Sequence, residues 1–227
     1  MHILITAGPT REHLDPVRFL SNRSTGKMGF AVAQAALERG HQVTLVAGPV
    51  SLSPPQGVTR VDVVSARDML AAVERSLPQC DALIMAAAVA DWRPAQAADT
   101  KLKKNAMAPV LQLVPNPDIL QTIAPLKGGR VFVGFAAETG GLIEEAQRKL
   151  AAKGLDLIVA NDVTAPGAGF AVDTNAVTLL AADTPPTVLP LQSKLEIGRI
   201  LVQWVEAKSA RPSGWRGSVS AIRPWSR

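Results

Sequence analysis

The chain has 227 residues, of which 47% are hydrophobic, and a formal net charge of +5. This length fits one α/β domain with a sizeable core, and no apolar run is long enough to span a membrane. The excess charge lies entirely in residues 208–227, which carry basic residues and no acid, whereas residues 1–207 carry equal numbers of both. The neutral body gives no reason to expect nucleic-acid binding, and we expect a disordered basic tail over 208–227.

Cysteine and histidine are scarce in this chain. Cys80 is the single cysteine, which excludes an internal disulfide and suits a reducing compartment. We find no signal peptide ahead of the first predicted strand and therefore expect a cytoplasmic protein. There is no cluster of Cys and His, so we expect no zinc site.

Strand and helix patterns alternate along residues 1–207. Apolar runs predict strands at 3–6, 42–47, 59–63, 81–88, 130–137 and 155–160, and a closing hairpin from 176–181 and 187–191. Helices are predicted at 30–39, 66–77, 116–126, 139–153 and 194–207. Ser65, with Asp68 three residues later, is a predicted N-cap, as are Thr139 and Ser193 for the last two helices. The pattern predicts a single α/β domain over 1–207 with a three-layer Rossmann-like fold, a mainly parallel sheet covered by helices on both faces, and a small C-terminal hairpin.

Residues 4–29 carry the strongest indication of a ligand site. The first predicted strand stops at Gly8, and a polar loop containing residues 22–25 leads to Gly26-Lys27-Met28-Gly29, where a helix begins. Backbone N–H groups at a helix start, surrounded by small residues, bind phosphate. Ligands of parallel sheets gather at the carboxyl ends of the strands, which is where this segment lies. The segment therefore predicts a site for a phosphorylated small molecule.

Two groups of lysines are candidates for chemistry. Lys101, Lys103 and Lys104 follow the strand predicted at 81–88, and Lys149 and Lys153 are spaced to share one helix face. Each group could be solvated surface. Each could instead face a triphosphate, where positive charge stabilises a phosphoryl transition state and a leaving pyrophosphate.

Four further residues near the predicted strand ends have two interpretations each. Asp91 could cap a loop or pair with Arg93, or it could contact a ribose or magnesium. Phe135 could be a core aromatic or pack against a ligand. Asn116 and Asn161 could satisfy turn backbones or line a site. Spacing alone leaves these alternatives open.

Several common enzyme motifs are absent. There is no G-x-G-x-x-G after the first strand, and the chain has no tyrosine for the Tyr-Lys pair of many dehydrogenases. A P-loop and a G-x-S-x-G elbow are also missing. An NAD(P)-dependent Rossmann oxidoreductase remains an alternative enzyme, and a non-catalytic nucleotide-sensing domain remains an alternative binding protein.

A set of segments in fixed order resembles the phosphopantothenate–cysteine ligase family, also called phosphopantothenoylcysteine synthetase. The resemblance runs from about Ile3 to Trp204. Its segments are ITAGPT with SNRSTGKMG, AAAVADWRP, KLKK, NPDI, VGFAAET, the helix with Lys149 and Lys153, LIVANDV and GFAVDTNAVTLL. The motifs are closer to the CTP-using bacterial type than to the ATP-using type.

The resemblance implies a two-step reaction in coenzyme A biosynthesis. The carboxylate of 4'-phosphopantothenate attacks the α-phosphorus of CTP, pyrophosphate leaves, and a phosphopantothenoyl-cytidylate forms. The amine of L-cysteine then displaces CMP to give an amide. Mg²⁺ carried by the triphosphate would assist, with help from Asp91 and without dedicated protein ligands.

The resemblance also implies partners and site residues. It implies a homodimer with sites near the subunit interface and KLKK in a mobile flap; residues 95–107, with few large apolar anchors, fit such a flap and would be poorly ordered without ligand. No flavin is expected here, and a flavin-dependent decarboxylase would be a separate or fused partner. The implied catalytic residues are Asn22, which would hydrogen-bond acyl or phosphoryl oxygens, and Lys101, which the first step would require. The implied nucleotide-binding residues are Met85, Ala86, Ala87, Asp91, Lys101, Asn116, Pro117, Asp118, Ile119, Phe135, Lys149 and Lys153. The implied phosphopantothenate-binding residues are Gly8, Asn22, Ser24, Gly26, Gly29 and Asn161.

Overall fold

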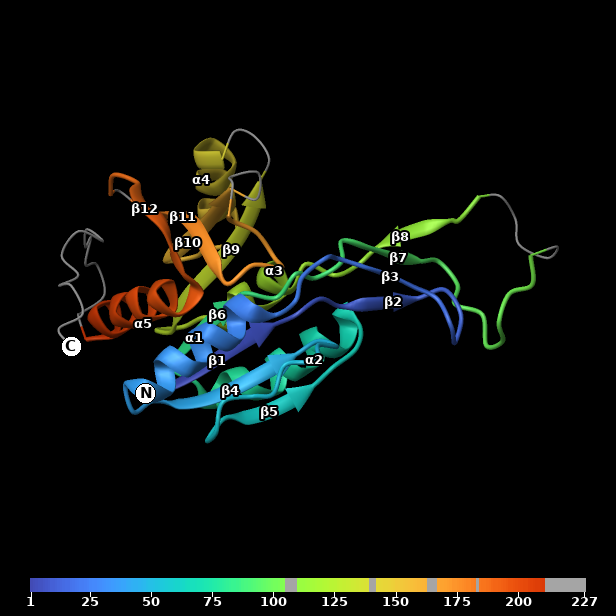
Figure 1. The fold of residues 1–227 in the computed structure, drawn as a ribbon, viewed down its shortest axis with the longest axis horizontal. Helices are drawn as coiled ribbons and strands as arrows, with labels where there is room; N and C mark the ends of the chain where they lie inside the picture. The colour runs from blue at the N-terminus through green and yellow to red at the C-terminus, as the bar shows by residue number, and fades with distance from the viewer. Residues whose placement is uncertain (105–109, 139–141, 163–166, 183, 211–227) are drawn as a thin grey trace.

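A computed structural model describes residues 1–104, 110–138, 142–162, 167–182 and 184–210. Its centre is an eight-stranded sheet in the order β12-β11-β10-β9-β6-β1-β4-β5 (Figure 1). These strands are β1 (His2–Ala7), β4 (Gln42–Ala47), β5 (Thr59–Asp62), β6 (Ala82–Met85), β9 (Val131–Glu138), β10 (Leu157–Asp162), β11 (Thr174–Ala181) and β12 (Thr187–Ser193). The strands from β10 to β5 pair in parallel, whereas β11 and β12 are antiparallel. The predicted hairpin is thus an edge of the main sheet.

Helices cover both faces of the sheet, as predicted. They are α1 (Lys27–Glu38), α2 (Ala66–Ser76), α3 (Ile119–Ile123), α4 (Leu142–Ala152) and α5 (Lys194–Ser209). Residues 3, 5 and 7 of β1 join a core with α1 and α5, and Leu4 joins a second core with α2, α3 and α4. This alternation of neighbouring residues between two apolar layers explains why the strand reads as a continuous apolar run.

Two of the predicted N-caps, Ser65 and Ser193, cap the helices α2 and α5 in the structure. Ser65 accepts a hydrogen bond from the Asp68 N–H, and Asp68 reaches back to the Ser65 N–H, which confirms the predicted capping box. Ser193 likewise accepts from the Glu196 N–H at the start of α5. Thr139 and most of the predicted tail lie outside the described residues, but α5 runs on to Ser209, beyond its predicted end.

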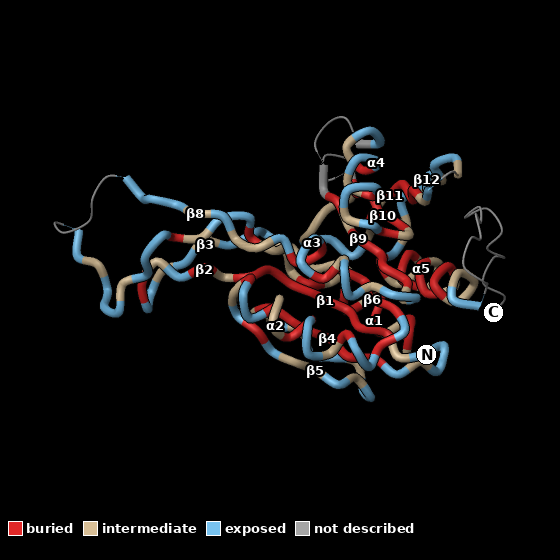
Figure 2. Tube along the Cα trace, turned by 180° about the vertical axis from the view of Figure 1, so that it is seen from behind, coloured by how far each residue is buried: buried red, intermediate tan, exposed pale blue. Residues whose placement is uncertain are grey.

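Two short ribbons that the sequence did not predict form an arm that projects from the body. One pairs β2 (Arg11–His13) with β3 (Phe19–Ser21), and the other pairs β7 (Trp92–Pro94) with β8 (Leu113–Pro115). Figure 1 shows the ribbons side by side, and Figure 2 shows that the arm is mostly exposed while the central strands of the sheet are buried. No helix in the described part of the chain is both long and apolar enough to cross a membrane.

Candidate functional site

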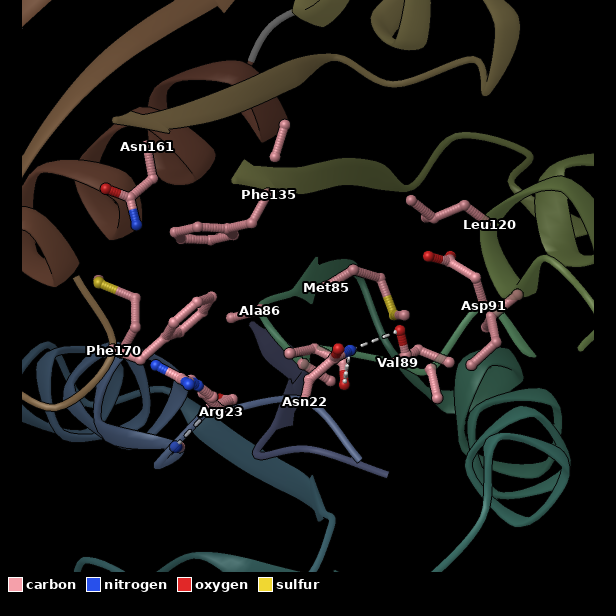
Figure 3. A pocket seen from close by; sticks show the side chains of 18 of the residues that line it. Asn22, Arg23, Met85, Ala86, Val89, Asp91, Leu120, Phe135, Asn161 and Phe170 are labelled. Carbon is pink, nitrogen blue, oxygen red and sulfur yellow. Dashed lines mark hydrogen bonds between the residues drawn. The ribbon is translucent and has the colours of Figure 1, made fainter. Parts of the chain in front are cut away.

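A cavity of about 790 Å³ opens at the carboxyl ends of β1, β6, β9 and β10. This size is typical of a small-molecule site, and the position is the usual one in a parallel sheet. Figure 3 shows Asn22, Asp91, Phe135 and Asn161 around its space. Fifteen of the predicted site residues line it: Asn22, Ser24, Gly26, Met85, Ala86, Ala87, Asp91, Asn116, Pro117, Asp118, Ile119, Phe135, Lys149, Lys153 and Asn161.

The start of α1 forms one end of the cavity. Gly26 precedes the helix with φ of +81°, a conformation that favours glycine, and no side chain caps the helix there. The Ser24 hydroxyl accepts the Gly26 N–H at 3.3 Å. The first-turn N–H groups of a helix without a side-chain cap, and with no acid in that turn, are oriented to bind an anion.

The loop after β6 forms the floor. The strand predicted to reach residue 88 ends at Met85, and the backbone after it bonds to side chains of β1 and of the loop that follows β1. The Thr6 hydroxyl accepts the Ala87 N–H at 3.1 Å, and the Thr10 hydroxyl accepts the Ala90 N–H at 3.0 Å. These bonds hold residues 86–91 open toward the cavity.

Asn22 bridges the α1 loop and this floor. Its Nδ2 donates to the carbonyl oxygens of Ala88 at 3.1 Å and Val89 at 3.0 Å (Figure 3). We expected Asn22 to bond acyl or phosphoryl oxygens, which requires a free donor. The amide donors are instead engaged with backbone, so the atom that Asn22 offers to a ligand is the acceptor Oδ1.

Asn116 joins a second loop to the same floor. Its Nδ2 donates to the Ala90 carbonyl at 2.8 Å, and its N–H donates to the Asp91 carbonyl at 2.8 Å. Arg93 donates to Asn116 Oδ1 at 3.3 Å and to the Pro115 carbonyl. Asn116 therefore satisfies loop backbone and lines the cavity at once, and Arg93 turns to this loop.

The opposite wall carries cations. Lys149 and Lys153 both line the cavity from α4 and from the residue after it. Lys153 pairs with Asp118 at 3.0 Å, and Lys149 lies 3.8 Å from Glu145. Each lysine side chain is about a third exposed, so it can form its ion pair and still face the cavity.

Asn161 is the most unusual polar group of the site. It is buried, and its Oδ1 has no hydrogen-bond partner. A buried acceptor without a partner costs free energy, which a ligand with a donor would recover. In Figure 3 its amide lies beside Phe135 at the edge of the cavity space.

Three predicted residues do not line the cavity: Gly8, Gly29 and Lys101. A Cβ on Gly29 would lie 2.5 Å from Ala7 Cβ and 2.8 Å from the Thr6 carbonyl oxygen. A Cβ on Gly8 would lie 2.9 Å from Val50, at φ of +79°. Gly29 thus lets α1 sit directly on β1, whereas Gly8 lets the loop after β1 pack against Gly48 and Val50, which follow β4.

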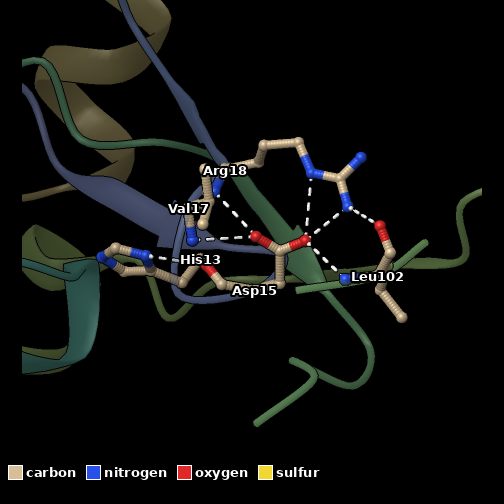
Figure 4. A network of polar contacts seen from close by, with 5 residues as sticks. All are labelled: His13, Asp15, Val17, Arg18 and Leu102. Carbon is tan, nitrogen blue, oxygen red and sulfur yellow. Dashed lines mark hydrogen bonds and ion pairs between the residues drawn. The ribbon is translucent and has the colours of Figure 1, made fainter. Parts of the chain in front are cut away.

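Lys101 lies exposed on the arm, next to a polar network around Asp15 (Figure 4). Asp15 accepts the backbone N–H of Leu102 at 3.2 Å, and Arg18 donates to the Leu102 carbonyl at 3.0 Å. Within this chain, Lys101 is therefore anchored to the arm and not to the cavity. Residues 105–107 of the expected flap lie outside the described residues.

Lys27, Phe170, Asn175 and Lys194 also line the cavity and were missed by the sequence analysis. Phe170 and Asn175 lie in the segment GFAVDTNAVTLL, so a family motif marked their position without giving a role. Nothing in the sequence singled out Lys194, which follows a helix cap. Cys80 is buried far from this edge, and burial raises the pKa of its thiol to about 11, which suits a structural residue.

The described residues hold no group of three or more His, Cys, Asp or Glu side chains that could bind a metal ion. Two carboxylates, those of Asp91 and Asp118, line the cavity, and Asp118 pairs with Lys153. The mainly parallel sheet, the helices on both faces and the cavity at the carboxyl ends of the strands together define a Rossmann-like α/β protein with a candidate site for a small molecule.

Comparison with known proteins narrows this class. A family model, the DNA/pantothenate metabolism flavoprotein C-terminal domain, matches residues 1–208, and the chain belongs to this family. The coenzyme A biosynthesis bifunctional protein CoaBC of Bacillus subtilis is 48% identical over 92% of this chain and 52% of its own length. The protein of the same name from Escherichia coli K12 is 52% identical over 89% of this chain and 50% of its own length. The chain thus spans about half the length of these curated relatives.

Solved structures agree with the fold. The crystal structure of the C-terminal domain of coenzyme A biosynthesis bifunctional protein CoaBC has a TM-score of 0.78 and 42% identity, and covers 91% of this chain and 94% of that one. The DNA/pantothenate metabolism flavoprotein from Streptococcus pneumoniae has a TM-score of 0.79 at 23% identity, with 91% and 99% covered. The second likeness concerns the fold alone.

Proposed function

We propose that this chain is a CTP-dependent phosphopantothenate–cysteine ligase of coenzyme A biosynthesis. One observation carries the proposal. A single cavity is lined by Asn22, Asp91, Lys149 and Asn161, which lie far apart in the chain. The family membership and the relatives named for coenzyme A biosynthesis support it. The remaining half of such relatives leaves room for a flavin-dependent decarboxylase as a fused or separate partner.

The cavity offers separate places for the two phosphorylated substrates. The 4'-phosphate of phosphopantothenate would bind at the start of α1, with Ser24 and Gly26 beside it and Asn161 offering its unpaired oxygen to a ligand hydroxyl or amide N–H. The cytidine nucleotide would lie along Met85–Ala87, Asp91 and residues 116–119, where Lys149 and Lys153 face the triphosphate. Phe135 lies between the two places.

This arrangement fits the expected chemistry. The substrate carboxylate attacks the α-phosphorus and pyrophosphate departs, so positive charge from the lysines stabilises the developing negative charge. Mg²⁺ bound to triphosphate oxygens supplies further charge neutralisation. In the second step, the Asn22 Oδ1 would accept a hydrogen bond from the cysteine amine as it attacks the acyl carbon, and CMP leaves.

Lys101 requires a second copy of the chain in this account. The arm that carries it projects from the body, and several apolar side chains on it are exposed, including Val17, Phe19, Trp92 and Leu113. Exposed apolar surface on paired ribbons is typical of an interaction site. We infer a homodimer in which the arm of one copy brings Lys101 toward the cavity of the other.

A pyrophosphate assay tests the proposal. Wild-type protein with CTP, Mg²⁺ and phosphopantothenate should release pyrophosphate, and adding L-cysteine should convert one turnover per site into continuous turnover. ATP should replace CTP poorly. Binding of both ligands without pyrophosphate release would instead favour a nucleotide-sensing domain. Tight NADH binding in a fluorescence titration would favour an oxidoreductase.

A further inference from the structure

Residues 169–173, here called the strap, form part of the cavity wall just before β11. Side chains from the starts of two helices hold the strap by its backbone. Lys194 Nζ donates to the carbonyl oxygens of Gly169 at 2.8 Å, Phe170 at 3.2 Å and Val172 at 2.5 Å. From α1 and its preceding loop, Lys27 Nζ donates to the Ala171 carbonyl at 2.9 Å and Thr25 donates to the Phe170 carbonyl at 2.6 Å. The strap is therefore fixed to the helix starts that border the proposed phosphate site.

Lys194 makes three of the five hydrogen bonds that hold the strap. It is only 4% exposed, and its ammonium donors all go to strap carbonyls. Burial and the neighbouring Lys27 lower the pKa of this ammonium. A buried cation is tolerated only where hydrogen bonds replace its water shell, so strap and Lys194 depend on each other for their positions.

The strap places one aromatic ring in the cavity. Phe170 lines the cavity, and Figure 3 shows its ring turned toward the ring of Phe135. Its carbonyl is bound by Thr25, the residue before Gly26. The ring is thus tied directly beside the uncapped start of α1, so an apolar surface adjoins an anion-binding one.

Phosphopantothenate has a matching chemical arrangement. Its phosphate ester is joined through one methylene to a quaternary carbon that carries two methyl groups. Covalent geometry forces these methyl groups to lie close to the phosphate, wherever the phosphate binds. A site that holds the phosphate must then either leave the methyl groups in water or cover them with an apolar side chain, which favours binding.

We propose that Phe170 selects for the paired methyl groups of phosphopantothenate, and that Lys194 is the positioning residue that holds Phe170 against them. This inference rests on the proposed function and identifies the part of the substrate that Phe170 of the strap recognises. It predicts that the strap affects the choice between acid substrates and leaves nucleotide use unchanged.

The direct test compares two substrates in the presence of CTP and L-cysteine. One is phosphopantothenate, and the other is the synthetic analogue that keeps the phosphate and hydroxyl but lacks both methyl groups. Wild-type protein should prefer the natural substrate by about tenfold in kcat/KM. In Phe170→Ala this preference should fall to about twofold, and Phe170→Leu should lie between, because a smaller apolar surface remains.

A lysine pair provides the control for positioning. Lys194→Met should raise the KM for phosphopantothenate and reduce the preference, while the KM for CTP stays near that of wild type. Lys127→Met removes another lysine that donates to a backbone carbonyl, that of Gly154 at 2.6 Å, but Lys127 does not line the cavity. It should lower stability without changing the preference.

The outcomes separate this inference from the proposed function. A wild-type preference that persists unchanged in both Phe170 variants would overturn the role of the strap while leaving the ligase intact. An unchanged preference in Lys194→Met would overturn the positioning role of Lys194. A wild-type protein that joins neither acid to cysteine would overturn the proposed function, and this inference with it.

Discussion

The carboxylate of Asp15 accepts the backbone N–H of Leu102 at 3.2 Å, across 87 positions of sequence. Arg18, which pairs with the same carboxylate, donates to the Leu102 carbonyl at 3.0 Å. The Asp15–Arg18 pair thus binds both the N–H and the carbonyl oxygen of Leu102, the residue after Lys101 (Figure 4). These contacts join the loop between β2 and β3 to the lysine segment of the arm.

The Asp15 network gives a pH prediction. Arg18, with backbone N–H groups of Val17, Arg18 and Leu102, holds the pKa of Asp15 well below its usual range. A carboxyl whose pKa is depressed by folding contributes stability above its unfolded pKa, about 4, and loses that contribution as the pH falls further. The difference in unfolding free energy between wild type and Asp15→Asn should therefore be constant from pH 6 to 8 and shrink below pH 4.

Urea denaturation across this pH range measures the effect. Asp62→Asn is a suitable control, because Asp62 is a mostly exposed partner of Arg60 on β5. A difference for Asp15→Asn that grows as the pH falls would contradict the network.

Asn22→Asp should separate the two half-reactions. A carboxylate cannot donate to the Ala88 and Val89 carbonyls, so the contact between the α1 loop and the cavity floor is lost. We expect CTP consumption to continue, with the acyl-cytidylate accumulating and little amide forming. Quenched-flow chromatography would detect the intermediate, and rapid amide formation would show that the second step does not need the bridge formed by the Asn22 amide donors.

Lys101→Gln should abolish pyrophosphate release, because the first step would lose its cation. Lys103→Gln is the matched control on the same exposed segment and should retain most of the activity. Equal and small effects of the two variants would show that this segment is ordinary solvated surface.

A mixture of Asn22→Asp and Lys101→Gln proteins tests whether a site is shared between two copies. If Asn22 and Lys101 of one site come from different copies, half of the sites in a mixed dimer regain both residues. Refolding the two variants together at equal amounts should then recover about a quarter of wild-type activity. If both residues came from the same copy, each mixed site would lack one residue and no activity would return.

Gly29→Ala should destabilise the protein by about 1–3 kcal/mol, since the added Cβ meets Ala7 and backbone of Thr6, which cannot move away easily. Gly129→Ala is the control, because a Cβ there would have no neighbour within 4 Å. Thermal or urea unfolding compares the two. A neutral Gly29→Ala would show that α1 does not depend on this close approach to β1.

The sequence predicted the layers well because each strand and helix carries its own pattern. Strand residues 42–47 were predicted with the bounds that the structure has, and Ser65 with Asp68 marked the start of α2. The arm was missed because its strands span three residues each, too few for a periodic pattern, and pair through contacts between distant loops. Pairing of that kind depends on tertiary structure rather than on local propensity.

In the site as well, residues in local motifs could be predicted, whereas residues brought in by tertiary contacts could not. The family motifs contain most of the cavity residues, because those residues lie in short contiguous segments, and half of the lining residues were predicted as site residues. Lys194 and Phe170 were missed since their role depends on how the start of α5 meets the strap, which no local spacing encodes. The donor role expected for Asn22 stays a prediction, and nothing in the sequence indicated that backbone carbonyls of a loop 66 and 67 positions away accept its amide N–H groups in this structure.

Isotope transfer tests the central claim most directly. Phosphopantothenate labelled with ¹⁸O in its carboxylate is incubated with CTP, Mg²⁺ and L-cysteine, and the CMP is analysed by mass spectrometry. If the carboxylate attacks the α-phosphorus and cysteine then attacks the acyl carbon, each CMP should carry one labelled oxygen. CMP formed without label would contradict the acyl-cytidylate, and so would amide formation without any CMP.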